Sequence, residues 1–195
     1  MRLKIQRGTP GQTELVTVEV SDGVSTALDA LLEAQESTPD LAFRYGCRNE
    51  TCGLCTVEID GRPRLACRDR VQEGSRIAPL RTLPLIRDLV IDRSEVDATA
   101  LPPGEPGVAS DAYTSLDRCI SCLACLDDCP IHEEGRGNPM LLLRIQQDRL
   151  SGSGDFLERA DAAGLERCAS CRQCRCGVGI RLVAEVIDPL LEAIE

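Results

Sequence analysis

The sequence predicts an α+β protein whose N-terminal part holds a mixed sheet and whose C-terminal part is helical. Two observations predict this division. Strand patterns and one helix occupy residues 1–94, whereas only short helical segments separate the cysteines in residues 111–195. Residues 95–110, EVDATALPPGEPGVAS, are rich in Pro, Gly and Ala and show no hydrophobic period, so we expect them to be a linker between two domains.

The N-terminal part begins with two predicted strands and a helix. Residues 2–6 and 14–20 alternate apolar and polar side chains and flank the turn-forming segment GTPGQ, which predicts two strands joined by a turn. Ser21 or Asp22 is then placed to cap a helix over residues 24–35. The apolar side chains of this segment recur at helical spacing, at Ala27, Leu28, Leu31 and Leu32.

Two further strands complete the predicted sheet. The segment TVEIDGRPRLAC reads as a hairpin whose turn is Asp60–Gly61, because Asp-Gly favours the left-handed backbone of a tight turn. A last strand near RIAPL would close the sheet. Strand, strand, helix, strand and strand in this order is compatible with a β-grasp unit.

The C-terminal part reads as short helices between cysteine clusters. The pair Asn138–Pro139 is a helix-start signal for residues 139–150. Pro189 is expected to kink or restart the last helix, because its ring removes a backbone donor. The further helical candidates are residues 154–163 and 180–187.

Twelve cysteines in 195 residues are the outstanding feature of the composition. They could form disulfides, bind zinc, hold iron–sulfur clusters or be inert buried thiols. Disulfides suit small secreted domains, but residues 1–7 read as the start of a strand and lack the apolar core and cleavage site of a signal peptide. The clustering of the cysteines therefore favours metal chemistry.

The charge and hydropathy of the chain exclude two classes of partner. A net charge of −10 disfavours nucleic acid, because phosphate contacts need a basic surface. No run of ~18 apolar residues occurs, so we expect no direct membrane span. Residues 42–81 differ from the rest of the chain, because eight Arg outnumber five acidic residues there. These Arg side chains either dock an acidic partner or are simply exposed on strand faces.

Four cysteines in the N-terminal part match the spacing of a plant-type [2Fe–2S] site, C-x4-C-x2-C with a distant fourth cysteine. They are Cys47, Cys52, Cys55 and Cys67. Three thiolates on one tight loop can enclose one side of a cluster, and Gly46 and Gly53 help backbone N–H groups approach its sulfide ions. Zinc is the alternative, but zinc sites favour two C-x2-C knuckles, which this set lacks. A Rieske centre is excluded, because it needs two His ligands and His132 is the only His.

The second set has the spacing of a bacterial ferredoxin, C-x2-C-x2-C-x3-C-P, in which the last cysteine ligates the other cluster. It consists of Cys119, Cys122, Cys125 and Cys129, followed by Pro130. The third set repeats the first three positions of that pattern. It consists of Cys168, Cys171, Cys174 and Cys176, and its fourth cysteine comes two residues early, before Gly177.

Because the fourth cysteines of such pairs cross over, two four-thiol groups are expected. Cys176 should complete a [4Fe–4S] site with Cys119, Cys122 and Cys125. Cys129 should complete a second site with Cys168, Cys171 and Cys174. This assignment uses all twelve cysteines, although the short gap between the last two leaves the identity of the crossed ligands open.

Four segments together resemble the iron–sulfur subunits of succinate dehydrogenases and fumarate reductases. They are FRYGCRNETCGLCTVEIDGRPRLAC, LIRDLVID, CISCLACLDDCP and CGVGI, and the resemblance covers nearly the whole chain. It implies a β-grasp [2Fe–2S] ferredoxin domain followed by an α-helical ferredoxin domain. It also implies that electrons enter from an FAD-containing flavoprotein at the [2Fe–2S] cluster and leave by the far cluster.

Two departures from the family bear on the clusters. Many members have a non-cysteine residue in the middle of the third triplet and hold a [3Fe–4S] cluster there. Here Cys171 supplies the ligand for a fourth iron, so we predict [4Fe–4S], with [3Fe–4S] as the alternative. Glu50 stands where the family loop usually has Gly, and a carboxylate there should disfavour the reduced cluster unless it points to solvent.

Two further departures bear on the electron acceptor. Quinone-binding members carry Trp after the Cys-Pro and often a His in the third motif, whereas this chain has no Trp and has Ala169 after Cys168. The segment between Cys129 and Asn138 is also short, near the place where a membrane anchor would dock in relatives. Quinone, a thiol system and another acceptor therefore stay open. Arg172 and Gln173 either raise the potential of the third cluster or mark an exposed loop.

The sequence favours the non-catalytic electron-transfer subunit of an oxidoreductase, with no active site of its own. It has no G-x-G-x-x-G fingerprint, and the lone His132 has no evident catalytic partner; it is a loop residue or a proton carrier. The expected partners are the flavoprotein and a membrane-anchor or other acceptor subunit. The alternatives are a thiol:fumarate or heterodisulfide reductase-type system, a free multi-cluster ferredoxin, and a redox sensor. We expect the cytoplasm, either free or held at the inner face of the membrane by another subunit.

Overall fold

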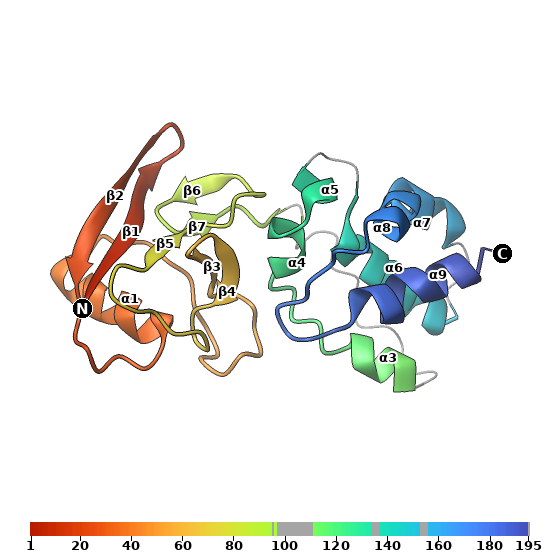
Figure 1. Cartoon of the computed structure of the whole chain (residues 1–195), viewed down its shortest axis with the longest axis horizontal. Coiled ribbons are helices and arrows are strands. Elements are labelled where there is room, and N and C mark those ends of the chain that lie inside the picture. Colours follow the sequence, from red (N-terminus) through yellow and green to blue (C-terminus); the bar gives the residue numbers. More distant parts are fainter. Residues whose placement is uncertain (95, 97–110, 134–136, 153–155, 195) are drawn as a thin grey trace. The chain divides into compact units, whose positions relative to one another are not determined.

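The chain forms two compact units, Met1–Arg93 and Ser94–Glu195, in a computed structural model (Figure 1). The structure describes all residues except 95, 97–110, 134–136, 153–155 and 195. The expected linker, residues 95–110, lies outside the described residues apart from Val96. The N-terminal unit contains the sheet and the C-terminal unit is helical, which confirms the predicted α+β class.

A five-stranded mixed sheet organises the N-terminal unit (Figure 1). Its strands are β1 (Arg2–Thr9), β2 (Gln12–Glu19), β3 (Thr56–Ile59), β4 (Arg62–Leu65) and β5 (Arg76–Ala78). The spatial order is β2-β1-β5-β3-β4, with β1 and β5 parallel and the other neighbours antiparallel. The inward side chains that form its core are fully buried, among them Leu3, Ile5, Leu31, Leu65 and Ile77. This sheet with its single long helix is the predicted β-grasp unit.

The predicted turns are present, and one of them is tighter than expected. Asp60 and Gly61 both adopt positive φ, 52° and 75°, as a two-residue hairpin turn requires. The first hairpin pairs as far as Thr9 and Gln12, so the strands extend into the segment that the sequence assigned to a turn.

The helix α1 (Ala27–Ser37) begins later than predicted, and the predicted cap is wrong. Thr26 caps the helix instead, since its hydroxyl accepts the N–H of Asp29 while the Asp29 carboxylate accepts the N–H of Thr26. Asp22 pairs with the amino terminus of Met1 at 2.8 Å, which removes it from the helix start.

A small second sheet, which the sequence did not indicate, contains the most buried carboxylate of the unit. Strands β6 (Leu85–Arg87) and β7 (Val90–Ile91) flank Asp88, which is 1% exposed. Its carboxylate accepts the N–H groups of Gly8 at 2.7 Å and Ala42 at 2.8 Å, and it pairs with Arg7 at 3.1 Å. Asp88 therefore ties the end of β1 to the segment that leads into the first cysteine loop.

Short helices form the C-terminal unit (Figure 1). They are α3 (Asp111–Leu116), α4 (Ala124–Asp127), α5 (Pro130–Glu133), α6 (Pro139–Leu150), α7 (Leu157–Ala162), α8 (Leu165–Cys171) and α9 (Asp188–Glu192). The start of α6 is confirmed, because the Asn138 side chain accepts the N–H of Leu141 at 2.9 Å. α7 falls within the predicted 154–163, whose first two residues lie outside the described part.

The last predicted helix is correct in place but not in type. Residues Val183–Ile187 form a π-helical segment, η1, which leads directly into α9. Pro189 lies in the first turn of α9 and cannot donate to the carbonyl of Glu185, so the regular α-helical ladder is interrupted there. The predicted restart at Pro189 is therefore confirmed.

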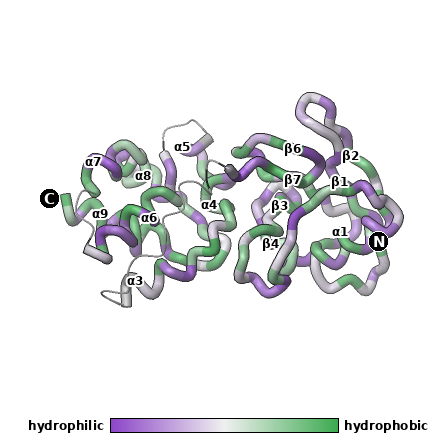
Figure 2. Tube along the Cα trace, turned by 180° about the vertical axis from the view of Figure 1, so that it is seen from behind, coloured by the Kyte–Doolittle hydropathy of each residue, from purple (hydrophilic) through white to green (hydrophobic). Residues whose placement is uncertain are grey.

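The core of the C-terminal unit brings the cysteine motifs and helices together. Hydrophobic residues recur along α6 (Figure 2). Buried residues of this helix and of other segments form one cluster that includes Leu116, Leu142, Ile145, Val186 and Leu190. Cys168 belongs to this cluster, and Cys119, Cys125, Cys174 and Cys176 pack against it. None of the helices in the described parts is long and apolar enough to cross a membrane.

Replacing Asp88 with Asn should destabilise the N-terminal unit by about 2 kcal/mol, because a buried charge-assisted network loses its anion. Burial by itself would raise the pKa of Asp88, but the N–H groups of Gly8 and Ala42 and the Arg7 guanidinium outweigh it and hold the pKa below its usual value. The stabilisation is thus present above the ordinary carboxyl pKa of about 3.9 and is lost as the pH falls.

Urea unfolding followed by far-UV circular dichroism at neutral and acidic pH measures this effect. The difference between wild type and Asp88→Asn should be largest at neutral pH and shrink toward acid. Asp40→Asn is the matched control, because Asp40 pairs with Arg7 and Arg87 but is 67% exposed. Equal losses in the two variants would contradict the importance of burial.

Candidate iron–sulfur sites

All twelve cysteines are free thiols, and none of them is in a disulfide. Four are buried and the other eight are half-buried. The buried ones are Cys55, Cys122, Cys129 and Cys168. Buried thiols are inert when they stay protonated, and they serve as ligands only where a metal or cluster stabilises the thiolate.

The first cysteine loop curls around its own sulfur atoms. The Cys47 sulfur accepts the N–H groups of Asn49 at 3.4 Å and Thr51 at 3.2 Å, and the Cys52 sulfur accepts the N–H of Cys47 at 3.4 Å. Arg48, Glu50 and Gly53 all adopt left-handed backbone, with φ of 59°, 67° and 66°. The Thr51 hydroxyl and the two N–H groups lower the pKa of Cys47 to about 6, which favours its thiolate.

The fourth thiol of this set, Cys67, is held by the start of α1. The N–H of Leu28 donates to the Ala66 carbonyl and that of Ala27 to the Asp69 carbonyl, both at 2.8 Å. Burial raises the pKa of Cys55 to about 12, and the nearby thiols of Cys67 and Cys52 add to the rise. The structure therefore brings together the four cysteines that the spacing grouped.

The left-handed backbone at Glu50 suits Gly, the residue that the resembling family usually has at this position. The negative charge of the Glu50 side chain is partly offset by an ion pair. The Glu50 side chain is 48% exposed and lies 3.7 Å from the Arg68 guanidinium. Arg68 follows Cys67 directly. The carboxylate thus points to solvent and is partly offset by a cation, the condition under which the sequence predicted no penalty.

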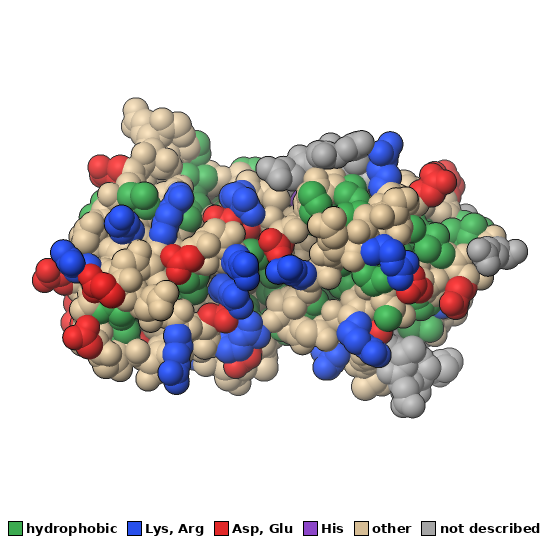
Figure 3. All heavy atoms as spheres, in the orientation of Figure 1, with side chains coloured by type: hydrophobic (Ala, Val, Ile, Leu, Met, Phe, Trp, Pro, Cys, Tyr) green, Lys and Arg blue, Asp and Glu red, His purple; other side chains and the backbone are tan. Residues whose placement is uncertain are grey.

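The region around this loop is basic and exposes hydrophobic side chains. Lys and Arg side chains gather over β3 and β4 in Figure 3. The Arg48 guanidinium lies 5.0 Å from the centre of the Tyr45 ring, which stacks on Phe43. Tyr45 is 40% exposed and Leu54 is 38% exposed. Exposed aromatic and Arg side chains of this kind are common in protein interfaces.

The second and third cysteine sets interleave. Burial raises the pKa of Cys122, and the neighbouring charges of Cys176 and then Cys119 raise it further. Burial also raises the pKa of Cys125 well above its usual value, with added repulsion from Cys122, Cys119, Cys176 and Cys174. Cys176 is thus a neighbour of thiols of the second set, and Cys174 also lies near Cys125, so the crossed pairing of ligands stays a prediction.

The complementary group contains the last cysteine of the second set. Burial raises the pKa of Cys168 to about 12, with contributions from Cys174, Cys129 and Cys171. Burial likewise raises the pKa of Cys174 to about 11, with contributions from Cys129 and Cys171. Arg175 alone separates Cys174 from Cys176, so a single residue connects the two proposed groups.

Each of the three thiol groups has a glycine against one of its sulfur atoms. A Cβ on Gly46 would lie 3.3 Å from the Cys52 sulfur, one on Gly137 3.3 Å from the Cys168 sulfur, and one on Gly177 3.0 Å from the Cys122 sulfur. The last contact joins the third motif to the second. Gly137 lies eight positions after Cys129, outside every motif, so the spacing rules did not reveal it.

These features fit iron–sulfur clusters. Neighbouring buried thiols can lose their protons only where a multivalent cation stabilises the thiolates, and backbone close to the sulfur atoms can supply the donors that such clusters use. Among the described side chains, no group of three or more Cys, His, Asp or Glu is placed to hold a single metal ion.

His132 is more than a solvated loop residue. It lies half-buried on α5, its backbone N–H donates to the Cys129 sulfur at 3.4 Å, and its Nδ1 is 3.0 Å from the Gly137 carbonyl oxygen. A carbonyl only accepts, so Nδ1 carries the proton in this contact. The ring thus fixes Gly137 beside Cys168.

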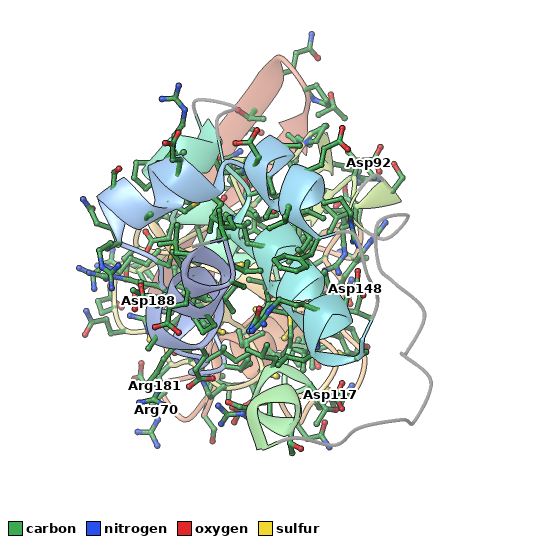
Figure 4. The ribbon with its side chains drawn as sticks, turned by 90° about the vertical axis from the view of Figure 1, so that its right-hand side faces the viewer. Arg70, Asp92, Asp117, Asp148, Arg181 and Asp188 are labelled. Atoms are coloured by element: carbon green, nitrogen blue, oxygen red, sulfur yellow. The ribbon has the colours of Figure 1, made fainter. Side chains whose placement is uncertain are left out.

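The third motif faces an open cavity and carries a compensated cation. The cavity, about 610 Å³, is lined by Ile131, Glu166, Arg167, Ser170 and Cys171. Arg172 adopts φ of 53° and donates two hydrogen bonds to the carboxylate of Asp188, at 2.8 and 2.9 Å. Asp188 is labelled in Figure 4, at the start of α9. A bidentate partner thus offsets the charge of Arg172.

Both units match known protein families. Residues 2–98 match the 2Fe-2S iron-sulfur cluster binding domain, and residues 118–181 match the 4Fe-4S dicluster domain. A chain of the Mycobacterium smegmatis Sdh1 complex in the apo form superposes with a TM-score of 0.83 and 32% identity, covering 99% of this chain and 94% of that chain.

Two curated proteins extend the comparison. The succinate dehydrogenase iron-sulfur subunit of Bacillus subtilis is 28% identical over 77% of this chain and 71% of its own length. A subunit of the fumarate reductase (CoM/CoB) of Methanothermobacter marburgensis is 31% identical over 97% of this chain and 43% of its own length. The chain spans about two fifths of the length of the first curated relatives that it matches.

Replacing Gly177 with Ala should impair the site of Cys119, Cys122, Cys125 and Cys176. The new methyl group would press on the Cys122 sulfur and on Ala124, and overpacking of this kind costs about 1–3 kcal/mol. Iron analysis and low-temperature EPR of the anaerobically purified protein should show less of this one cluster. Gly23→Ala is the control, because nothing lies within 4 Å of the added methyl group there. Full cluster content in both variants would contradict the assignment.

Proposed function

Because the chain belongs to the family of succinate dehydrogenase and fumarate reductase iron–sulfur subunits, we propose that it relays single electrons between an FAD-containing flavoprotein subunit and a second donor or acceptor. The observation that supports the proposal is the proximity of thiols within the first cysteine set and between the second and third sets, where neighbouring thiols raise one another's pKa. Bound clusters would supply one-electron acceptors and donors, while the partner subunit converts the substrate.

The proposed ligands follow these groups. Cys47, Cys52, Cys55 and Cys67 hold a [2Fe–2S] cluster. Cys119, Cys122, Cys125 and Cys176 hold a [4Fe–4S] cluster. Cys129, Cys168, Cys171 and Cys174 hold a second [4Fe–4S] cluster, since the Cys171 thiol lies near Cys168 and Cys174 and is free to bind a fourth iron. Buried thiols with raised pKa must release protons to bind, so loading is favoured by higher pH.

The flavoprotein would dock on the surface around the first cysteine loop. Tyr45 and Leu54 expose hydrophobic area beside Cys47 and Cys55, and Arg44 and Arg48 are exposed on the same loop. Neither Arg forms an ion pair among the described residues, which leaves their charges available to an acidic partner.

The second donor or acceptor would approach the cavity beside Cys171. Its lining combines an apolar side chain, Ile131, with the polar side chains of Arg167, Glu166 and Ser170. A membrane-anchor subunit that binds quinone, or a subunit of a thiol-linked system, could occupy this position. The similarity to a fumarate reductase (CoM/CoB) supports the thiol-linked system as the second candidate. In either case another subunit would hold the chain, in the cytoplasm or at the inner face of the membrane.

Succinate should reduce the [2Fe–2S] cluster if the partner is a succinate-oxidising flavoprotein. The measurement is low-temperature EPR of the tagged protein, purified gently and without oxygen from its own host, before and after succinate is added. Dithionite provides the control, because it reduces the clusters whatever the partner. Clusters that respond to dithionite and not to succinate would favour the thiol-linked system or another flavoprotein.

Cys171→Ala should convert the second [4Fe–4S] cluster to [3Fe–4S], because one iron loses its only protein ligand. The oxidised variant should then show a [3Fe–4S] EPR signal that the oxidised wild type lacks. Ser170→Ala changes the neighbouring side chain and should show no such signal. A [3Fe–4S] signal in freshly purified wild type would overturn the assignment of Cys171.

A further inference from the structure

One arginine of α6 reaches the loop of the second cysteine motif. Arg144 lies in the middle of the helix, and its Nη2 donates to the Ser121 hydroxyl oxygen at 2.8 Å. Ser121 directly precedes Cys122 and has a left-handed backbone, with φ of 50°. The guanidinium is thereby placed against the loop that carries Cys119 and Cys122.

The charge of this guanidinium has no carboxylate counterion in the described part of the chain. Its Nη1 donates to the side-chain oxygen of Gln147 at 3.0 Å, so both of its hydrogen-bond acceptors are neutral. Its Nε is buried and has no hydrogen-bond partner among the described residues. Arg172 at the third motif differs, since Asp188 neutralises it.

We propose that Arg144 is a positioning residue that raises the reduction potential of the cluster held by Cys119, Cys122, Cys125 and Cys176. Arg stays protonated at all accessible pH values. A half-buried charge is screened less than an exposed one, so its field reaches the cluster. Reduction adds a negative charge, which a nearby cation stabilises, and net charge and hydrogen bonds near the sulfur atoms set cluster potentials.

The two clusters of the C-terminal unit therefore differ in the charge beside them. Arg144 at the second motif has no carboxylate partner among the described residues, whereas Arg172 at the third motif is paired with Asp188. Arg144 favours the reduced form of one cluster, whereas the Arg172–Asp188 pair leaves the other nearly unaffected by that arginine. This inference rests on the proposed binding of a [4Fe–4S] cluster by the second motif.

Gln147→Glu tests the charge without removing Arg144. The substitution is isosteric and places a carboxylate at the atom that now accepts from Nη1. The matched control is Gln146→Glu, one residue away on the same helix, where the side-chain oxygen accepts from Arg149 at 2.9 Å. Arg149 lies over the Phe156 ring in the last turn of α6, so its neutralisation concerns a different part of the unit.

The readout is the midpoint potential of each cluster, from EPR-monitored redox titration of the anaerobically purified protein. Gln147→Glu and Arg144→Met should lower the potential of the second-motif cluster alone. Arg144→Lys should restore most of it, and Gln146→Glu should leave it unchanged. At a potential where half of this cluster is reduced in the wild type, the reduced fraction in Gln147→Glu should be clearly smaller.

Two results would overturn the inference. One is an unchanged potential in Gln147→Glu with the cluster present, and the other is an equal shift in Gln146→Glu. If Arg144→Met does not retain its cluster, Gln147→Glu and Arg144→Lys still decide, because both keep a side chain that can donate to Ser121. A wild type without any [4Fe–4S] signal would instead refute the proposed function, which separates the two failures.

Discussion

The constraint on which the rest of the structure depends is the free energy needed to ionise neighbouring buried thiols. Burial raises the pKa of Cys55, Cys122 and Cys168, and in each group the neighbouring thiolates raise it further. The proposed iron–sulfur clusters would offset this cost, because they would supply positive charge at the point where the sulfur atoms converge. Five cysteines of the C-terminal unit belong to its hydrophobic core or pack against it, so the proposed clusters would couple ligand binding to folding there.

The two units prepare their thiol groups by different means. In the N-terminal unit, a sheet and the start of α1 hold the loop and Cys67, while Asp88 anchors the segment that precedes the loop. In the C-terminal unit, short helices of four to twelve residues give little regular structure of their own. The cysteine loops are instead supported by contacts from elsewhere, such as Gly177 against Cys122 and His132 beside Gly137.

Electrostatics around the three groups are not uniform. Glu50 faces Arg68 near the first group, Arg172 faces Asp188 near the third, and Arg144 faces neutral oxygens near the second. Charge placement is one of the means by which a protein tunes cluster potentials. The same ligand type, a cysteine thiolate, can then serve clusters with different tasks.

The sequence by itself determined the order of strands and helix along the first unit and the helix after Asn138, and it predicted the cysteine groups, because spacing and local backbone preference are properties of short segments. It misplaced the cap of α1, because Thr26 forms a capping box with Asp29, whereas Asp22 pairs with the amino terminus. The burial of Asp88, the contact of Gly137 with Cys168 and the hydrogen bond from Arg144 to Ser121 join residues far apart in the chain. Only the tertiary structure decides such features, because burial and charge compensation depend on which distant segments meet.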